Sequence, residues 1–405
     1  MTPRRILFWL HLTAGSVAGI MILVMSVTGV LLVFQRPVIA WVDRAGRSHE
    51  PSAGAPRMPL GDLMAKAAAT QGAAPTAVTL YAPPDMPVEI AFGRERTVYF
   101  DSDTAAELGV GSQRTRAFFQ AVENWHRWLA APDKSRPTGR LITGTCNLAF
   151  FFLVVTGAYL WWPRGWSAQR LRAAMTWRWK VEPGRARDWN WHTVTGFWLA
   201  APLAVITLSG VVMSFAWANN LLYRATGNVP PAPPEAAQAA NAGASRRAPA
   251  VRPEIASIDA ARMNDLWVRA QSQVPGWRKI TLRIPPNPSA PAVFTIDQGD
   301  GGRPDMRSQL SVDTRTGETL RWEPFGSYNL GRRLRMWLRF SHTGEAGGIP
   351  GQAIAVAAAL GGTLLVYTGL AMAWRRFLAR FFRCGAPAAS RLRPEPSLET
   401  GDAAP

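Results

Sequence analysis

The chain has 405 residues, of which 48% are hydrophobic, and it carries a formal net charge of +18 at pH 7. Its apolar residues are concentrated in four stretches with almost no charge, at 7–34, 141–162, 192–218 and 349–374. About 20 helical residues cross a bilayer core of roughly 30 Å, and each stretch is that long. A buried core helix reaches such a length once rather than four times, so this pattern excludes an ordinary soluble protein.

The first apolar stretch follows Arg4 and Arg5, as a signal peptide would. However, it is longer than the apolar core of a signal peptide, and no small-x-small cleavage site precedes Gln35 and Arg36. We therefore expect a retained membrane anchor. The long segments that follow the first and third stretches form outer domains, and the chain ends in a tail at 375–405.

The distribution of positive charge predicts the topology. The short loop at 163–191 contains seven basic residues, and the tail begins with several arginines. Short basic loops stay in the cytoplasm, whereas long domains cross the membrane largely regardless of their charge. Both termini are therefore expected to be cytoplasmic. Basic residues also flank the second and fourth stretches on the outer side, and the bias almost vanishes when they are counted: Arg127, Lys134, Arg136, Arg140, Arg332, Arg333, Arg335 and Arg339.

The two long outer segments have similar patterns. In the first, a helical pattern at 60–70 precedes three strand-like runs at 77–81, 88–92 and 97–101. In the second, a helical pattern at 258–274 precedes runs at 279–284, 292–296 and 309–313. Asp, Thr and Gly mark the turns that follow the last strands. Each segment is expected to form a small α+β module with one helix on a three-stranded sheet. Residues 229–253 are a Pro/Ala-rich linker.

Two spaced motifs recur in the apolar stretches. The first and third share H-x3-G-x12-[ST]-G, and the second and fourth share T-G-x4-W-x-R. The same period and order in both halves predict a duplicated unit of span, outer module and span. The fold class is thus an α-helical membrane protein with four transmembrane helices and two α+β modules. The matching positions are His11, Gly15, Thr28 and Gly29 with His192, Gly196, Ser209 and Gly210, and Thr156, Gly157, Trp162 and Arg164 with Thr368, Gly369, Trp374 and Arg376.

Four of the five histidines occupy equivalent ends of the spans. Seventeen residues separate His11 from Thr28, or roughly 26 Å of helix, so His11 and His192 lie near the inner face. His126 and His342 precede the second and fourth spans and lie near the outer face. Histidines at membrane depth are costly and usually functional. Two imidazoles on facing helices can bind a haem iron from both sides, and small residues such as Gly15 and Gly196 leave room for the macrocycle.

Several alternatives remain open. A histidine at a span end can lie at the interface with nothing bound. Zinc or copper also binds paired histidines, although no cysteine or carboxylate accompanies them at a useful spacing. The Thr-Gly pairs are either helix-packing positions or cofactor contacts, and the outer arginines contact either haem propionates and anionic ligands or lipid head groups. His49 lies in a polar stretch and is expected on the surface. Most tryptophans fit an interfacial belt, and the two cysteines form no disulfide framework or c-type haem motif.

At this point the sequence resembles the PepSY-associated transmembrane family over nearly its whole length. The resemblance rests on WHRWL followed by ITGTCNLAFFFLVVTGAYLWWPR, on WNWHTVTGFW with LSGVVMS, and on SHTGEAGGIPGQ with VYTGLAMAWRR. It implies a bacterial inner-membrane protein with PepSY-like modules in the periplasm. The expected parts are transmembrane helices at 1–35, 141–162, 192–218 and 349–374, periplasmic segments at 36–140 and 219–348, a cytoplasmic loop at 163–191 and a cytoplasmic tail at 375–405.

Members of this family resemble reductases of ferric siderophores with two b-type haems. The resemblance implies that His11, His126, His192 and His342 are axial ligands of haem iron. The expected function is electron transfer to ferric chelates in the periplasm, with a cytoplasmic flavoprotein or quinol as the electron donor. No dinucleotide or Walker fingerprint occurs in the chain. Two alternatives remain: a non-enzymatic regulatory or scaffold protein, and a haem conduit to a periplasmic partner reductase.

Overall fold

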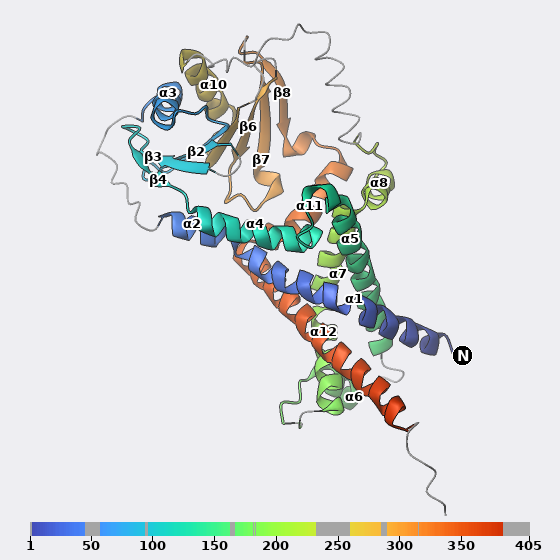
Figure 1. Ribbon diagram of the computed structural model, residues 1–405. Helices are drawn as coiled ribbons and strands as arrows, with labels where there is room; N and C mark the ends of the chain where they lie inside the picture. The colour runs from blue at the N-terminus through green and yellow to red at the C-terminus, as the bar shows by residue number, and fades with distance from the viewer. Residues whose placement is uncertain are drawn as a thin grey trace, which may run out of the picture.

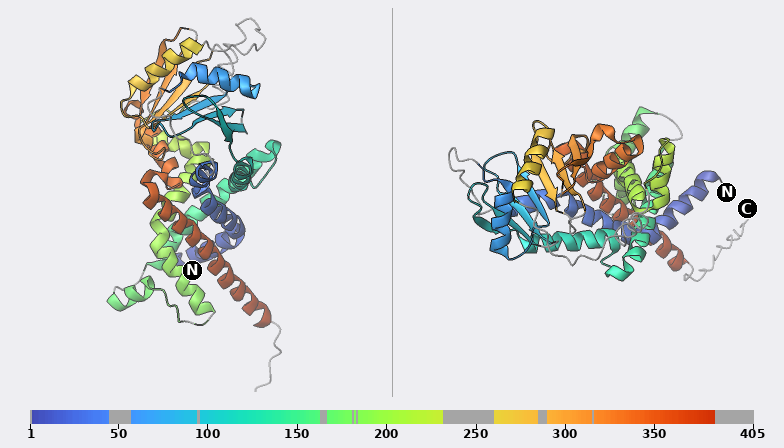
Figure 2. Two further views of the ribbon diagram at one scale, coloured as in Figure 1. Left: turned by 90° about the vertical axis from the view of Figure 1, so that its left-hand side faces the viewer. Right: turned by 90° about the horizontal axis from the view of Figure 1, so that it is seen from above.

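The computed structural model of the protein describes residues 2–44, 57–93, 96–162, 167–180, 182, 184–231, 260–284, 290–314 and 316–383. His49, Cys384 and nearly all of the predicted linker at 229–253 lie outside these residues. The described part consists of a bundle of long helices with a β-sheet domain at one end (Figure 1). Two further views show the same arrangement, with the first residues of the chain and the last turns of the final helix at the end away from the sheet (Figure 2).

Four long helices form the bundle: α1 (Pro3–Val33), α5 (Arg136–Trp161), α7 (Arg185–Ser214) and α12 (Gly348–Arg383). Within the described residues, four helical segments containing them are long and apolar enough to cross a membrane, as the sequence predicted. Helices α1 and α7 each pack against both α5 and α12. The four helices therefore form a ring in which α1 and α7 face each other across the centre.

The helices extend beyond the apolar stretches in several places. Helix α7 begins at Arg185, two turns before the predicted start at position 192, and it ends at Ser214 because Phe215 adopts an extended backbone conformation. The predicted third span therefore includes the start of a separate helix, α8 (Ala216–Ala225). The short helix α6 (Ala168–Met175) packs against α7 at the end of the bundle away from the sheet (Figure 1).

The two outer modules form one continuous antiparallel sheet with strand order β4-β3-β2-β1-β5-β6-β7-β8. Strands β1 and β5 join the modules, with Val78 opposite Leu282 and Leu80 opposite Ile280. The prediction of three strands in each module was wrong, because each also has a short edge strand, β4 or β8. The strands are β1 (Ala77–Tyr81), β2 (Val88–Phe92), β3 (Arg96–Phe100), β4 (Glu107–Val110), β5 (Lys279–Arg283), β6 (Ala292–Asp297), β7 (Arg307–Val312) and β8 (Thr319–Pro324).

Helices α3 (Leu60–Gln71) and α10 (Ala260–Gln273) cover one face of this sheet and pack against each other (Figure 1). Alternate strand residues point toward them, and a single hydrophobic core contains fully buried side chains from both modules, including Ile90, Phe100, Ile280 and Phe294. The opposite face is polar, and it carries the pair Thr79 and Thr281 at the junction of the modules. The apolar core thus unites the two modules into one domain.

Shorter helices connect the sheet to the bundle. Helix α2 (Gln35–Arg44) continues from α1 and packs beside α4 (Gln113–Trp128), while α11 (Leu330–His342) precedes α12. Helix α4 packs against α1 and α5, and α11 packs against α7. Between α4 and α5 the chain reverses through Leu129 and Ala130, which both have a positive φ of 54°. Helix α4 therefore folds back and carries His126 to the end of α1 nearer the sheet, and α11 carries His342 to the corresponding end of α7.

Candidate functional site

The four histidines of the repeat lie at two levels of the bundle. At the level nearer the sheet, His126 at the end of α4 faces His342 at the end of α11, with ring centroids 6.4 Å apart and an angle of 68° between the ring planes. At the other level, His11 on α1 and His192 on α7 are close enough to interact electrostatically. The helices thus bring together the two pairs that the sequence predicted.

Each histidine contacts a hydroxyl group on a neighbouring helix. In the level nearer the sheet, Nδ1 of His126 lies 2.9 Å from Oγ1 of Thr28, and Nδ1 of His342 lies 3.0 Å from Oγ of Ser209. In the other level, Nδ1 of His11 lies 2.8 Å from Oγ1 of Thr156, and Nδ1 of His192 lies 3.0 Å from Oγ1 of Thr368. The four hydroxyl residues are those of the repeated Thr-Gly and Ser-Gly pairs.

The hydrogen bonds of these hydroxyl groups determine the histidine tautomers. Each hydroxyl donates its one proton to a backbone carbonyl of its own helix, such as Val24 for Thr28 and Leu364 for Thr368. The hydroxyl oxygen therefore accepts a hydrogen bond from Nδ1–H of the histidine. Nδ1 of His342 also donates to the carbonyl oxygen of Ile206 at 2.9 Å. The proton is thus on Nδ1, and the lone pair of Nε2 is free to bind a metal.

The glycines of three of the four pairs lie beside an imidazole ring. A Cβ atom on Gly369 would lie 3.3 Å from Cε1 of His192, closer than an ordinary contact, and a Cβ atom on Gly157 would lie 3.4 Å from Cε1 of His11. On Gly29 it would lie 3.6 Å from Cε1 of His126, an ordinary contact distance, and on Gly210 it would lie 2.8 Å from Asn147. The hydroxyl of each pair therefore contacts the histidine, whereas only Gly369 is needed for the close approach of the ring.

From the sequence alone, these pairs could be either helix-packing positions or cofactor contacts. The sequence contains a signal that favours contact with the histidines, because the [ST]-G pairs occur at a fixed spacing from them in the repeat.

Gly15 and Gly196, predicted to make room for a macrocycle, lie beside leucine side chains of the neighbouring helices. A Cβ on Gly15 would lie 3.8 Å from Leu153, and one on Gly196 would lie 3.6 Å from Leu365. These are ordinary contact distances, so neither glycine is required by a close approach of protein atoms.

The pair nearer the sheet, His126 and His342, is called the outer pair, and His11 and His192 are called the inner pair. The ring spacing of the outer pair suits two ligands on one metal. Two imidazole nitrogens that bind a metal from opposite sides at about 2 Å each place their ring centroids roughly 6 Å apart, close to the spacing of His126 and His342. Among the described residues, no group of three or more His, Cys, Asp or Glu side chains could hold a metal ion. A pair of histidines alone suits a cofactor that brings its own equatorial ligands. The residues present therefore fit haem iron, which takes axial imidazoles.

The environment of His342 favours a neutral ring. Its side chain contacts Ser209 and Ile206 of α7 and faces His126 of α4, and its burial lowers the pKa of His342 below its usual value. A neutral imidazole is the form that binds a metal. Together with the Nδ1–H donated to Ser209 and Ile206, the lowered pKa leaves Nε2 unprotonated near pH 7.

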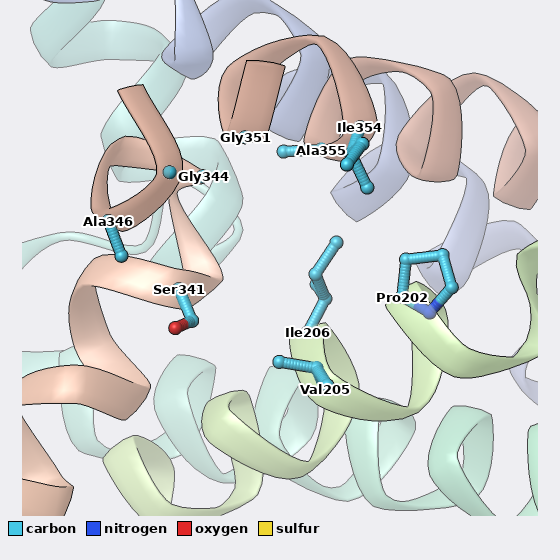
Figure 3. Close-up of a pocket in the computed structure, with 10 residues that line it drawn as sticks. Pro202, Val205, Ile206, Ser341, Gly344, Ala346, Gly351, Ile354 and Ala355 are labelled. Atoms are coloured by element: carbon cyan, nitrogen blue, oxygen red, sulfur yellow. The ribbon is translucent and has the colours of Figure 1, made fainter. Parts of the chain in front are cut away.

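A small apolar hollow of about 220 Å³ lies beside the outer pair, between α7, α11 and α12. Figure 3 shows Pro202, Val205 and Ile206 of α7 on one side and Ile354 and Ala355 of α12 on the other. Ser341, which precedes His342, also lines this hollow. The packing of α7 against α12 therefore leaves a gap at the level of the outer histidines.

The inner end of the bundle contains a buried ion-pair cluster. Asp188 is fully buried on α7, one helical turn before His192. It accepts a hydrogen bond from Arg187 at 3.1 Å and pairs with Arg375 of α12. Arg375 lies two turns beyond Thr368, the partner of His192. Helices α7 and α12 are thus joined at two successive levels on the inner side.

The comparison with protein families agrees with this arrangement. The family model described as the PepSY-associated TM region matches residues 8–376. The chain belongs to this family. The matched region includes α5 and α7, most of α1 and α12, both β modules and the four histidines of the PepSY-associated protein. No curated protein matches the sequence.

Proposed function

We propose that this PepSY-associated membrane protein is a di-haem electron-transfer protein that reduces ferric iron chelates, such as siderophores, in the periplasm of a bacterium. The proposal rests on the outer pair, because the ring centroids of His126 and His342 are 6.4 Å apart. This spacing fits two axial ligands of one iron. In this proposal the sequence is a duplicated unit, both termini are cytoplasmic and both β modules are periplasmic.

The residues of the chain bind and orient the cofactor. His126 and His342 would hold one haem b, and His11 and His192 the other. Haem held by these residues would supply one-electron redox chemistry. The Thr and Ser hydroxyls fix each imidazole so that Nε2 points away from its supporting helix. Surrounding apolar side chains of the bundle, such as Ile22 and Val366, exclude water from the region between the two levels.

The proposed overall reaction is the transfer of one electron to each Fe(III), which gives Fe(II). The donor is a cytoplasmic flavoprotein or a membrane quinol, which releases the electron on oxidation. Ferric iron binds hard oxygen ligands more strongly than ferrous iron does, so reduction weakens the chelate. Two features support periplasmic reduction: the outer histidine pair lies next to the sheet, and the sheet turns a polar face away from its covering helices.

The test uses purified full-length protein, reduced anaerobically and freed of excess reductant. Mixing with a ferric hydroxamate or catecholate chelate should reoxidise the protein and form Fe(II), which a ferrous-specific chromogenic chelator reports. His126→Ala should lose one haem and most of this rate, whereas the control His49→Ala should lose neither. Unchanged haem content and rate in His126→Ala would show that the pairing is wrong. Reduced protein that remains reduced with every chelate would instead point to a partner reductase.

A further inference from the structure

A cluster of cationic side chains lies between the sheet and the outer histidine pair. Arg339 precedes His342 by three residues on α11, so the two share one side of the helix. Arg36, at the start of α2, pairs with Glu345 at 3.2 Å, and Glu345 follows His342 by three residues. Arg36 also donates to the carbonyl oxygen of Gly301, at 3.3 Å, in the second β module. The cluster therefore connects the bundle, the sheet and the histidine site.

Arg307 of β7 completes the cluster. Its guanidinium carbon lies 5.2 Å from the ring centroid of Phe340, and that of Arg339 lies 5.5 Å from the same centroid. Phe340 is only 3% exposed, and its buried ring lies within cation–π distance of both guanidinium groups. A Cβ atom on Gly301 would lie 3.6 Å from Nη2 of Arg307 and 3.9 Å from Nη1 of Arg36. Three arginines thus converge within a small space.

The carboxylates nearby do not balance this positive charge. Glu345 pairs with Arg36, and Asp297 accepts a hydrogen bond from Arg307 at 2.8 Å. Arg335, Lys279 and Glu89 also interact with the cluster, and Asp300 lies at the same turn, where it accepts a hydrogen bond from the backbone N–H of Gly302 at 3.0 Å. Five cations therefore face four carboxylates, an excess of one positive charge.

Burial and the nearby positive charges lower the pKa of Lys279, which lies beside the cluster, and the pKa of Arg339, which belongs to it. Burial lowers the pKa of Lys279, and the positive charges of Arg36 and Arg307 lower it further. Burial also lowers the pKa of Arg339, and Arg36, Arg307 and Arg335 add to this effect. An arginine remains protonated even so. Arg36 is 52% exposed and Arg307 is 26% exposed, so an anion from solution can reach the cluster, and clustered positive charge attracts anions.

We propose that Arg36, Arg307 and Arg339 form an anion-binding site beside the outer histidine pair, and that its ligand is an oxygen anion of the carboxylate type. Planar guanidinium groups bind such anions through paired charge-assisted hydrogen bonds. The anion comes from one of two sources, a propionate of the outer haem or an anionic ferric chelate. The choice between these sources rests on the proposed function, whereas the anion site itself does not.

The test compares Arg36→Gln, Arg307→Gln and Arg339→Gln with the control Arg303→Gln, all in full-length protein in detergent. Arg303 lies near the same turn but pairs with Asp305 at 2.5 Å and is not one of the cluster residues. Each variant therefore loses one positive charge, but only the first three lose it from the cluster. Thermal unfolding first identifies the variants that are folded, and Arg→Lys replacements at the same positions keep the charge while removing the paired geometry.

The two sources predict different results. If the anion is a propionate, the cluster variants lower one of the two haem midpoint potentials, because lost positive charge destabilises the reduced haem. The KM values for chelates then stay unchanged. If the anion belongs to the substrate, the KM for an anionic ferric chelate rises about tenfold, the effect of one charge-assisted hydrogen bond. The KM for a neutral chelate and both midpoint potentials then stay unchanged.

A third measurement needs no haem. Titration calorimetry with gallium(III) citrate, an anionic and redox-inert analogue of a ferric chelate, should show binding to the wild type that the cluster variants weaken. If the protein proved haem-free, weakened binding of this probe would still support the anion site while the proposed function failed. Unchanged midpoint potentials, KM values and gallium citrate binding in all three cluster variants would overturn the anion site, as would an equal effect of Arg303→Gln.

Discussion

The hydroxyl of Thr28 accepts a hydrogen bond from Nδ1–H of His126 at 2.9 Å, although 98 residues separate the two in the chain. The same contact occurs at three other places in the bundle, between His11 and Thr156, His192 and Thr368, and His342 and Ser209. A hydroxyl that orients a ligand histidine acts on the metal through that ligand. Changes to the four hydroxyl residues should therefore alter cofactor binding more than folding.

Thr156→Val should weaken cofactor binding at the inner pair by about 10–100-fold, the usual effect of removing a hydrogen-bond partner of a ligand histidine. Among the described residues, Thr156 is the one acceptor next to Nδ1 of His11. Thr28→Val should have a smaller effect, because His126 also has the Met25 carbonyl as an acceptor. Titration of the haem-depleted protein with haem measures the cofactor affinity of both variants. Thr193→Val is the control, since that hydroxyl bonds only to its own helix, and an equal loss there would contradict the prediction.

Gly369→Ala should remove or distort haem binding at the inner pair without unfolding the protein. The added Cβ would lie 3.3 Å from Cε1 of His192, so the ring must move by a few tenths of an ångström. Within a helix, alanine is otherwise favourable over glycine by about 0.5–1 kcal/mol. Visible spectra and thermal unfolding should therefore separate the two effects. Gly29→Ala, where the distance is 3.6 Å, should change the spectrum less, and equal changes would show that ring clearance is not the cause.

Asp188→Asn should destabilise the inner end of the bundle. Asp188 is fully buried and pairs with Arg187 and Arg375. Removing one member of a buried ion pair costs about 3–5 kcal/mol, because the other charge remains without its partner. Thermal unfolding in detergent measures this loss. Asp133→Asn provides the matched control: Asp133 pairs with Arg136 but is 85% exposed, so its change should be far smaller. The double mutant Asp188→Asn/Arg375→Gln should be more stable than Asp188→Asn alone, because it also removes the arginine that loses its partner.

Ile280→Ala should destabilise both β modules together. Ile280 is fully buried opposite Leu80, at the junction of β1 and β5. A cavity of this kind costs about 2–5 kcal/mol. Hydrogen exchange measured by mass spectrometry should show faster exchange in β1 and β2 as well as in β5 and β6. Val268→Ala, at a 62% exposed position of α10, serves as the control. Faster exchange confined to the second module would show that the modules fold independently.

Much of this arrangement could be predicted from local patterns. Long uncharged stretches identify the four apolar helices, because the bilayer sets their length. The strands β1, β2 and β3 alternate in hydrophobicity, and so do β5, β6 and β7, because one face of each is buried. Strands β4 and β8 were missed. They lie at the edges of the sheet, and the ELGV and TLRWEP segments carry little apolar alternation.

Contacts between distant segments could not be predicted in this way. The pairing of β1 with β5 joins residues about two hundred positions apart, and no local periodicity encodes it. The depth of His126 and His342 was also unknown, since Pro132 and Pro350 interrupt the chain before their spans. The reversal at Leu129 and Ala130 and the packing of α4 and α11 on the bundle bring the two histidines against Thr28 of α1 and Ser209 of α7. The hydroxyl partners of the histidines became apparent only with this packing.

The most direct measurement is the reduced-minus-oxidised visible spectrum of the detergent-purified protein, with haem quantified per chain after expression with an adequate haem supply. Two bis-histidine sites predict sharp bands of low-spin b-type haem at about two haems per chain. His11→Ala and His126→Ala should each retain about one. A colourless protein, or haem content that neither substitution changes, would contradict haem binding by these two histidine pairs.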